Sequence, residues 1–516
     1  MIGTSLGEWI LIRLSILFFR FTPLLYSILL LFVRLVPGPG QSAWRGAATH
    51  GLGALLLAEA LFYAAIYLPY SRRLRATASH PPPLSPAARK ALFHRCMAHV
   101  SDFECYLRRW FMGASVDDIC RDNVRDFFLW AFFDMAEADA VASPHHAAIA
   151  AELDEYVAFT ERCLKRPLGP GRGAAQCLRL TLDRVETTYR SLAWYLVVLT
   201  LDHATHLAML WYGFHYYARA PTGALMTFPP RPFELFARRR SSAPGLGYWH
   251  RPHRPDRDHL PVLFFHGIGI GLWTYVRFVA DLRRADRRAR GVIVPELLPI
   301  SFRLTAPPPD RLEFLLQMAS ILDQHAGWDR FTIVSHSYGS VLTTHMLTSS
   351  TLGGRVASVV LVDPVSIMLH LPDVAYNFTR RRPTEANEWQ LWYFASTDPG
   401  VAHCLGRHFF WRENILWKED LLSTGGGHPY PRKVMVCLAG RDLIVHVAAV
   451  AQYLGGESMT GSAGLGPVVA RGGSARDQDQ GRVGVVVFPN LDHAQIFDSA
   501  PDRQRLADMV SLCCGG

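Results

Sequence analysis

Residues 331–347 read FTIVSHSYGSVLTTHML, and this stretch decides the fold of the second half of the chain. It opens with a β-branched apolar run and closes with a segment that fits a helix. Ser337 stands between the two. A serine on a sharp strand-to-helix turn has its hydroxyl raised above the sheet, and the residues two before and two after it must be small. Ser335 and Gly339 meet this requirement, although glycine is commoner than serine at the first position.

Other short apolar runs surround this turn, and helical stretches such as 311–326 alternate with them. Apolar runs of this kind are typical of parallel strands buried on both faces. The alternation predicts a mostly parallel, doubly wound α/β sheet. The runs are LPVLFFHG (260–267), GVIVPELLPI (291–300), VASVVLVDPV (356–365), PRKVMVCLAG (431–440) and RVGVVVFPN (482–490).

A nucleophilic serine needs a base that takes its proton and an acid that orients the base. Asp442 and His493 each follow a predicted strand, so both are expected at the same edge of the sheet as Ser337. Asp363 also ends a strand and is the alternative acid. Asp492 adjoins His493 and is a weaker candidate, because adjacent side chains on a loop seldom face each other.

The order Ser337, Asp442, His493 and the strand ends that carry them resemble the α/β-hydrolase superfamily over residues 245–516. The resemblance implies an oxyanion hole. Its donors would be the backbone N–H of Tyr338 and that of Gly267 or Ile268, in the loop after the strand at 260–267. The layout of the whole chain also resembles membrane-anchored fungal α/β-hydrolases whose substrates are undefined.

Residues 366–430 form an insertion between two predicted strands, at a point where it would cover the nucleophile as a lid. Its aromatic side chains suit an apolar acyl group, but they would serve equally to pack the lid onto the core. They are Trp389, Trp392, Phe394, Phe409, Phe410, Trp411 and Trp417.

Residues 1–75 predict a membrane anchor with two transmembrane helices, within 9–36 and 52–70. A secretory signal peptide is the competing interpretation of the first segment. The basic SRRLR sequence follows the second segment. The positive-inside rule therefore predicts a hairpin anchor or a multi-pass membrane protein with a cytosolic catalytic domain.

Between the anchor and the catalytic half, residues 76–230 predict a helical region, in which 191–218 is a possible third membrane-associated helix. This segment carries Asp202, His203 and His206, so a monotopic or buried helix is as good an interpretation as a span. A basic, proline-rich linker is expected over 231–258. The catalytic domain is expected over 259–516.

Several other functions are excluded or disfavoured by the sequence. The net charge is +9, but no nucleic-acid-binding motif occurs, and the basic clusters lie beside apolar segments. The glycines of HGIGIG do not have the spacing of a dinucleotide-binding loop. His203 and His206 lack the context of a metal site. We therefore expect no cofactor and no metal.

Together these features predict a membrane-associated serine hydrolase that cleaves carboxylic esters, of lipid-like or otherwise apolar acyl groups, through an acyl-enzyme. Two alternatives remain open at this point. One is an acyltransferase that uses the same nucleophile, and the other is an inert α/β-hydrolase fold that acts as a scaffold. The expected partners are an ester substrate and a membrane. The oligomeric state does not follow from the sequence.

Overall fold

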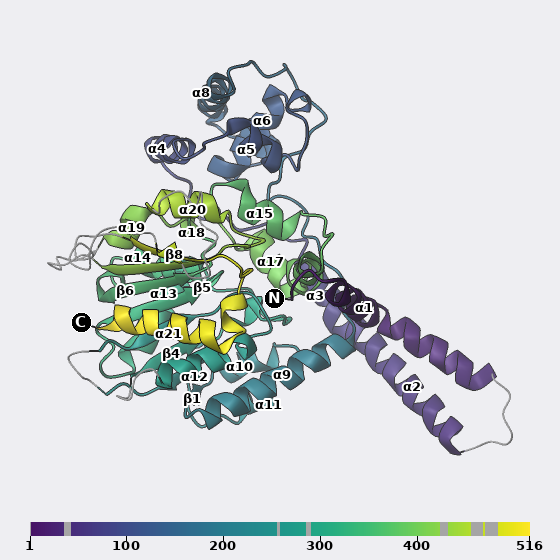
Figure 1. Cartoon of the computed structure of the whole chain (residues 1–516). Helices are drawn as coiled ribbons and strands as arrows, with labels where there is room; N and C mark the ends of the chain where they lie inside the picture. The colour runs from purple at the N-terminus through teal and green to yellow at the C-terminus, as the bar shows by residue number, and fades with distance from the viewer. Residues whose placement is uncertain are drawn as a thin grey trace.

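The structure is a computed structural model of the whole chain (Figure 1). It describes residues 2–35, 43–254, 259–284, 290–423, 432–455, 468–469 and 483–515.

A twisted sheet lies at the centre of the catalytic half. Among the described residues it has nine strands in the order β1-β2-β4-β3-β5-β6-β7-β9-β8. Strands β3 to β7 and β9 are parallel, whereas β1, β2 and β8 pair antiparallel to their neighbours. The strands are β1 (His215–Tyr217), β2 (Tyr248–Arg251), β3 (Val262–Phe265), β4 (Val292–Pro295), β5 (Phe331–His336), β6 (Val356–Val362), β7 (Lys433–Ala439), β8 (Val468–Val469) and β9 (Val483–Phe488).

Helices cover both faces of this sheet, because its strands are buried on both sides. One face packs against α12 (Val276–Arg284) and α21 (Ala500–Cys514). The opposite face packs against α13 (Arg311–Asp323) and α14 (Gly339–Leu347). The six strands that the apolar runs predict are all present, and the α/β-hydrolase fold expected from the sequence is confirmed.

The sheet begins well before residue 259, where the catalytic domain is expected to start. Strand β2 lies inside the segment predicted to be a linker, and it pairs with β4 from Tyr248↔Pro295 to Arg251↔Val292. Strand β1 pairs with β2 in turn. The interpretation of 231–258 as a linker is therefore wrong for the part that forms β2. Residues 255–258 lie outside the described residues.

The region before the sheet is helical, as expected, and Figure 1 shows much of it as a separate layer over the top of the sheet. Phe93 and Tyr156 stack at its centre, with ring centroids 3.9 Å apart. The helix at 86–97 begins where Ser85 accepts a hydrogen bond from Ala88 N. The main helices of this layer are α4 (Pro86–Met97), α5 (Phe103–Trp110), α6 (Arg121–Phe128) and α8 (His146–Leu164).

Two long apolar helices, α1 (Leu6–Leu35) and α2 (Ala43–Phe62), form a hairpin that projects from the body (Figure 1). In the described part of the chain, two helical segments are long and apolar enough to cross a membrane, 6–35 and 44–73. The third segment considered, α9 (Leu192–Trp211), is not one of them. It packs along the catalytic domain and ends just before β1.

The insertion after β6 folds into a series of short helices beside the sheet (Figure 1). It begins after Val365 and is followed as far as Ser423, because residues 424–430 lie outside the described residues. Its helices are α15 (Pro372–Thr379), α16 (Ala386–Gln390), η7 (Leu391–Ser396), α17 (Pro399–Arg407), α18 (Trp411–Asn414) and α19 (Lys418–Leu422).

Candidate active site

Ser337 lies on the turn between β5 and α14, with a positive φ of 51°. Few residues other than glycine adopt this conformation, and its cost is stored in the local backbone. The turn is held by two hydrogen bonds. Ser337 N donates to Val362 O at 2.9 Å, and the Ser340 hydroxyl donates to Ser337 O at 2.7 Å. The geometry is that of a nucleophile raised on a strand-to-helix turn.

The residues around this turn are small because the space beside them is limited. A Cβ on Gly339 would lie 2.4 Å from Phe265 O, so only glycine fits there. Ser335 replaces the commoner glycine because its hydroxyl has room and a partner. Thr343 Oγ1 donates to Ser335 Oγ at 2.9 Å.

The structure brings Ser337, His493 and Asp442 into one hydrogen-bonded chain. His493 Nε2 lies 2.9 Å from Ser337 Oγ, and His493 Nδ1 lies 2.7 Å from Asp442 Oδ2. The second oxygen of Asp442 accepts hydrogen bonds from the backbone N–H groups of Ile444 and Val445, at 2.7 and 2.9 Å. These bonds fix the carboxylate, which can then orient the imidazole.

The electrostatics of this chain favour a positive charge on His493. Burial alone would lower the pKa of His493, but the surrounding carboxylates, Asp442 first and then Asp363 and Asp492, together outweigh it and raise the pKa to about 9. An imidazolium that forms when His493 accepts a proton is therefore stabilised in place.

Asp363, the alternative acid, has a different position. Its two oxygens accept hydrogen bonds from Ala439 N at 2.8 Å and from Ala494 N at 3.0 Å. The carboxylate thus ties the end of β7 to the loop that carries His493. Burial, followed by repulsion from Asp442, raises the pKa of Asp363 to about 7. The geometry favours Asp442 as the partner of His493.

The Asp492 carboxylate also accepts hydrogen bonds from backbone N–H groups. Its Oδ1 accepts from Leu443 N at 3.0 Å and from His493 N at 2.7 Å. Its Oδ2 accepts from the side-chain amide of Asn387 in the insertion, at 2.7 Å. Asp492 therefore holds the histidine loop in place and does not pair with the imidazole.

One of the two candidate oxyanion donors in the loop after β3 is already hydrogen-bonded. Gly267 N already donates to the Tyr275 hydroxyl at 3.1 Å, so it is not free to bind an oxyanion. Ile268 lines the same cavity as Ser337 and Tyr338. Of the two alternatives that the sequence leaves open, the geometry favours Ile268 N, together with Tyr338 N at the start of α14.

Two buried histidines brace this loop. His266 contacts Gly267 O through Nδ1 at 2.8 Å, and Leu297 N donates to His266 Nε2 at 3.0 Å. The Tyr275 hydroxyl, which accepts from Gly267 N, lies 2.8 Å from His336 Nδ1. Tyr275 therefore links the oxyanion loop to the turn at Ser337. Burial holds the pKa of His336 well below its usual range, so this ring stays neutral.

A group of three side chains, His336, Asp363 and His493, brings potential metal-binding atoms within 4.8 Å of one another. Two of the three side chains have other partners, however. Asp363 accepts two backbone N–H groups, and His493 lies between Ser337 and Asp442. We therefore assign no metal to this group.

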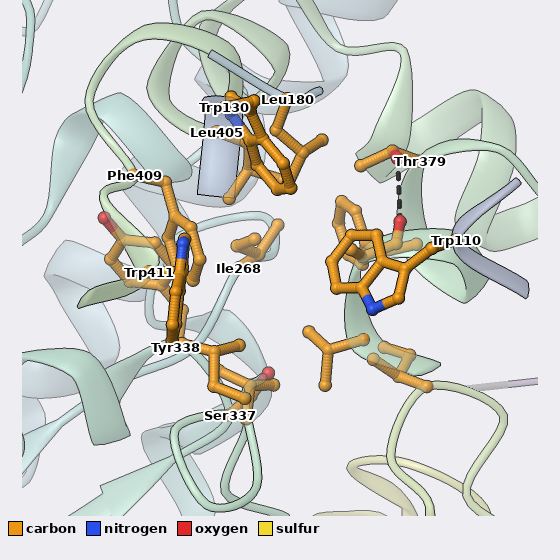
Figure 2. Close-up of a pocket in the computed structure, with 16 residues that line it drawn as sticks. Trp110, Trp130, Leu180, Ile268, Ser337, Tyr338, Thr379, Leu405, Phe409 and Trp411 are labelled. Atoms are coloured by element: carbon orange, nitrogen blue, oxygen red, sulfur yellow. Dashed lines mark hydrogen bonds between the residues drawn. The ribbon is translucent and has the colours of Figure 1, made fainter. Parts of the chain in front are cut away.

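An apolar cavity opens above Ser337, and nearly all of its lining side chains are aromatic or aliphatic. Figure 2 shows Ser337 at its base and a ring of aromatic and aliphatic side chains above. Phe409 and Trp411 of the insertion line it, whereas Trp389 packs against the guanidinium of Arg13. Such a lining suits an apolar acyl group.

The helical region before the sheet also contributes to this cavity, which the sequence does not indicate. Trp110, Trp130 and Leu180 form part of the wall opposite Ser337 (Figure 2). Two of the cavity's indoles are fixed by hydrogen bonds, from Trp130 Nε1 to Thr181 Oγ1 at 3.0 Å and from Trp411 Nε1 to Ala131 O at 2.8 Å. Nothing local in the sequence marks these residues, because they read as core positions of amphipathic helices.

No protein-family model matches the chain, and no curated protein sequence matches it either. Solved structures with a similar fold are found at low sequence identity. One is a membrane phospholipase A described as a bacterial virulence factor, with 12% identity and a TM-score of 0.36, covering 62% of this chain and 92% of that protein.

A second is a thermophilic esterase from Thermogutta terrifontis, with 15% identity and a TM-score of 0.34, covering 52% of this chain and 94% of that protein. A third is a carboxylesterase from Bacillus subtilis, with 12% identity and a TM-score of 0.33, covering 62% of this chain and 99% of that protein. These similarities are distant, and the description of the fold rests on the strand order and on the turn at Ser337.

Proposed function

We propose that this chain, which has the α/β-hydrolase fold, is a membrane-anchored serine hydrolase that cleaves carboxylic esters with apolar acyl groups. The observation that carries the proposal is the hydrogen-bonded chain from Asp442 through His493 to Ser337, at the base of an apolar cavity. A nucleophile, a base and an orienting acid in this arrangement can perform acyl transfer.

In the first half-reaction, Ser337 Oγ attacks the ester carbonyl while its proton passes to His493 Nε2. Asp442 keeps the imidazole in place and stabilises the imidazolium. The N–H groups of Tyr338 and Ile268 stabilise the negative oxygen of the tetrahedral intermediate. This intermediate collapses as His493 returns the proton to the alcohol that leaves. The acyl group remains on Ser337 as an ester.

In the second half-reaction, a water molecule gives a proton to His493 and attacks the acyl carbon. The proton then returns to Ser337 as the carboxylic acid is released. An alcohol in place of water would give acyl transfer by the same steps. Hydrolysis is the primary proposal, because no feature of the described cavity selects an alcohol acceptor.

The α1–α2 hairpin supports the membrane part of the proposal. Its exposed side chains are largely leucine, isoleucine and phenylalanine, and water would solvate them poorly. Residues 72–75, RRLR, follow the second apolar segment, so the catalytic domain is proposed to face the cytosol. An apolar ester dissolved in the same membrane is the substrate that best fits this anchor and cavity.

The test is turnover of a p-nitrophenyl ester by purified full-length chain in detergent. Ser337→Ala is expected to lower kcat by roughly 10⁴-fold or more. Ser350→Ala, which changes an exposed serine outside the site, is the matched control and should keep full activity. Equal rates for the two variants would refute the proposal. Product analysis with a competing alcohol then separates hydrolysis from acyl transfer.

A further inference from the structure

The outer face of α9 carries large apolar side chains that no described residue covers. Leu196, Leu207, Leu210 and Trp211 point away from the domain, and Trp211 is 85% exposed. Their spacing places them on one side of the helix. Single exposed apolar residues are ordinary, but Leu207, Leu210 and the largely exposed Trp211 lie together at the end of the helix.

Neighbouring elements extend this apolar surface. The short helices α10 (Pro221–Leu225) and α11 (Pro232–Leu235) precede β2, and Phe233 packs against His203 and His206 of α9. Beside these helices, Leu225 is 74% exposed and Phe236 is 83% exposed. The short helix that contains Trp273 also contacts α9, and Trp273 is exposed. We call these residues together with the outer face of α9 the α9 surface.

The inner face of α9 fixes which side points outward. Asp202 is buried between Arg231, with Nε 3.1 Å away, and Arg303, with Nη2 2.8 Å away. Arg231 in turn binds Glu296 at the end of β4, at 2.8 Å. This ion-pair network holds α9 against the sheet. The helix therefore cannot turn its apolar row inward or leave the domain to cross a membrane by itself.

The α9 surface is continuous with the proposed anchor. Glu59 of α2 accepts hydrogen bonds from Leu192 N, the first residue of α9, and Ser191 Oγ donates to Thr22 Oγ1 of α1 at 3.1 Å. Figure 1 shows α9 leaving the base of the hairpin and running along the side of the catalytic domain. A membrane that takes up the hairpin therefore lies close to the start of α9.

The charge next to this surface has the sign that an anionic membrane attracts. Arg238, Arg239 and Arg240 lie two to four residues after Phe236 and are exposed. Arg240 hydrogen-bonds Glu234 O and Leu235 O, which fixes the loop and leaves Arg238 and Arg239 at the surface. Basic side chains beside exposed aromatic and aliphatic residues are typical of segments that lie in a lipid headgroup region.

We propose that the α9 surface is a second membrane contact, which lies in the plane of a lipid bilayer with anionic headgroups. Its apolar residues enter the boundary between headgroups and acyl chains, and the arginines contact the phosphates. This proposal rests on the membrane anchoring in the proposed function. It adds that the catalytic domain is held against the bilayer on the side of α9, not suspended from the hairpin alone.

The test uses the full-length Ser337→Ala chain in nanodiscs of phosphatidylcholine and phosphatidylserine that contain a phosphatidylcholine with a photoreactive acyl chain. After illumination, lipid adducts are mapped to peptides. Adducts are expected on the hairpin and on peptides that cover 196–211 and 225–236. Helix α13 is the matched control, because its exposed Leu312 and Leu316 lie over the opposite face of the sheet.

A variant separates specific contact from general labelling. Leu207→Glu with Trp211→Glu and Phe236→Glu should lose the adducts at α9 and keep those on the hairpin. These three residues are exposed, so a chain that keeps Ser337 and carries the same three changes should still turn over a soluble ester. That turnover checks that the variant folds. Adducts on the hairpin alone, or equal labelling of α13, would overturn the α9 contact. Absence of adducts on the hairpin would refute the anchor as well.

Discussion

At the scale of single residues, the account depends on the protonation of His493. The base must be neutral to accept the proton of Ser337, so activity is lost as pH falls below the pKa of His493. Since Asp442 and the other nearby carboxylates raise this pKa to about 9, kcat/KM is expected to rise with pH from neutral toward about 9. The measurement is kcat/KM for a soluble ester across this range.

Asp442→Asn provides the comparison. Burial lowers the pKa of His493, and Asp442 is the leading group that opposes it. Without this carboxylate the pKa should fall, so the residual activity should reach its plateau at lower pH. The rate at the plateau should fall by about 10⁴-fold, because the imidazole is no longer held in the productive orientation. A wild-type profile that is flat between pH 6 and pH 9, with the same profile for the variant, would contradict this assignment.

Trp110 should limit the length of the acyl chain. It lines both the cavity above Ser337 and a smaller void behind it, which it shares with Trp130 and Trp411. Trp110→Ala should join the two spaces and lower KM for long-chain esters relative to short ones. The measurement is kcat and KM for p-nitrophenyl esters of increasing chain length.

Trp389→Ala is the control for this prediction, since Trp389 belongs to the insertion but does not line the cavity. It should leave the chain-length profile unchanged. If Trp110→Ala also leaves the profile unchanged, the helical region does not contribute to the acyl site.

At the scale of elements, the loop after β3 is positioned through Tyr275. Tyr275→Phe would leave Gly267 N and His336 Nδ1 without their partner, at a cost of about 1–3 kcal/mol for each buried group. Because the same loop carries the N–H of Ile268, kcat should fall by about tenfold or more, with little change in KM. The measurement is steady-state kinetics together with thermal unfolding.

Tyr453→Phe is the matched control. Its hydroxyl also accepts a backbone N–H, that of Lys418 at 3.0 Å, but it lies on α20 (Val447–Leu454), away from the oxyanion loop. This variant should lose stability and keep kcat. A loss of stability in both variants with no loss of kcat in Tyr275→Phe would reduce Tyr275 to a structural role.

The sequence predicts those elements whose own residues form a recognisable pattern. Strands β3 to β7 and β9 are continuous apolar runs, and the turn at Ser337 adds small residues at fixed spacing. Strands β1 and β2 are short and read HYY and YWHR, so they show no such run. They exist because β4 offers an unpaired edge, and that is a property of the folded sheet.

Some residues of the candidate site can likewise be predicted from local sequence, and others cannot. Ser337, His493 and Asp442 can be proposed from the sequence, since each follows a strand and parallel strands end at one edge. The choice between Gly267 and Ile268 cannot be made there, because it depends on the hydroxyl of Tyr275. The wall formed by Trp110 and Trp130 depends on how the helical region docks onto the sheet, and long-range docking leaves no local pattern.

At the scale of the whole molecule, the proposed anchor is part of the folded body. Ile12 and Ile16 of α1 are buried against Ala386 and Tyr393 of the insertion. Trp9 Nε1 also donates to Thr384 O at 3.1 Å. The first half of α1 therefore supports the elements that cover the active site, whereas its second half projects with the hairpin.

Substitutions in the two halves of α1 should therefore have unequal effects on the stability of the protein. Ile12→Ala and Ile16→Ala should each destabilise the protein by about 2–5 kcal/mol, because each leaves a cavity in a packed contact. Ile28→Ala and Leu31→Ala, on the exposed and projecting part of α1, should have little effect in detergent. Thermal unfolding of the four variants measures this, and equal midpoints would show that α1 acts only as a tether.

The most direct measurement on the central claim is the site and rate of labelling by a fluorophosphonate, read by mass spectrometry of the digested full-length chain. We expect one adduct, on the hydroxyl of Ser337, and labelling that is far slower in His493→Ala. An adduct on a different residue, or labelling of Ser337 at the same rate without His493, would contradict it.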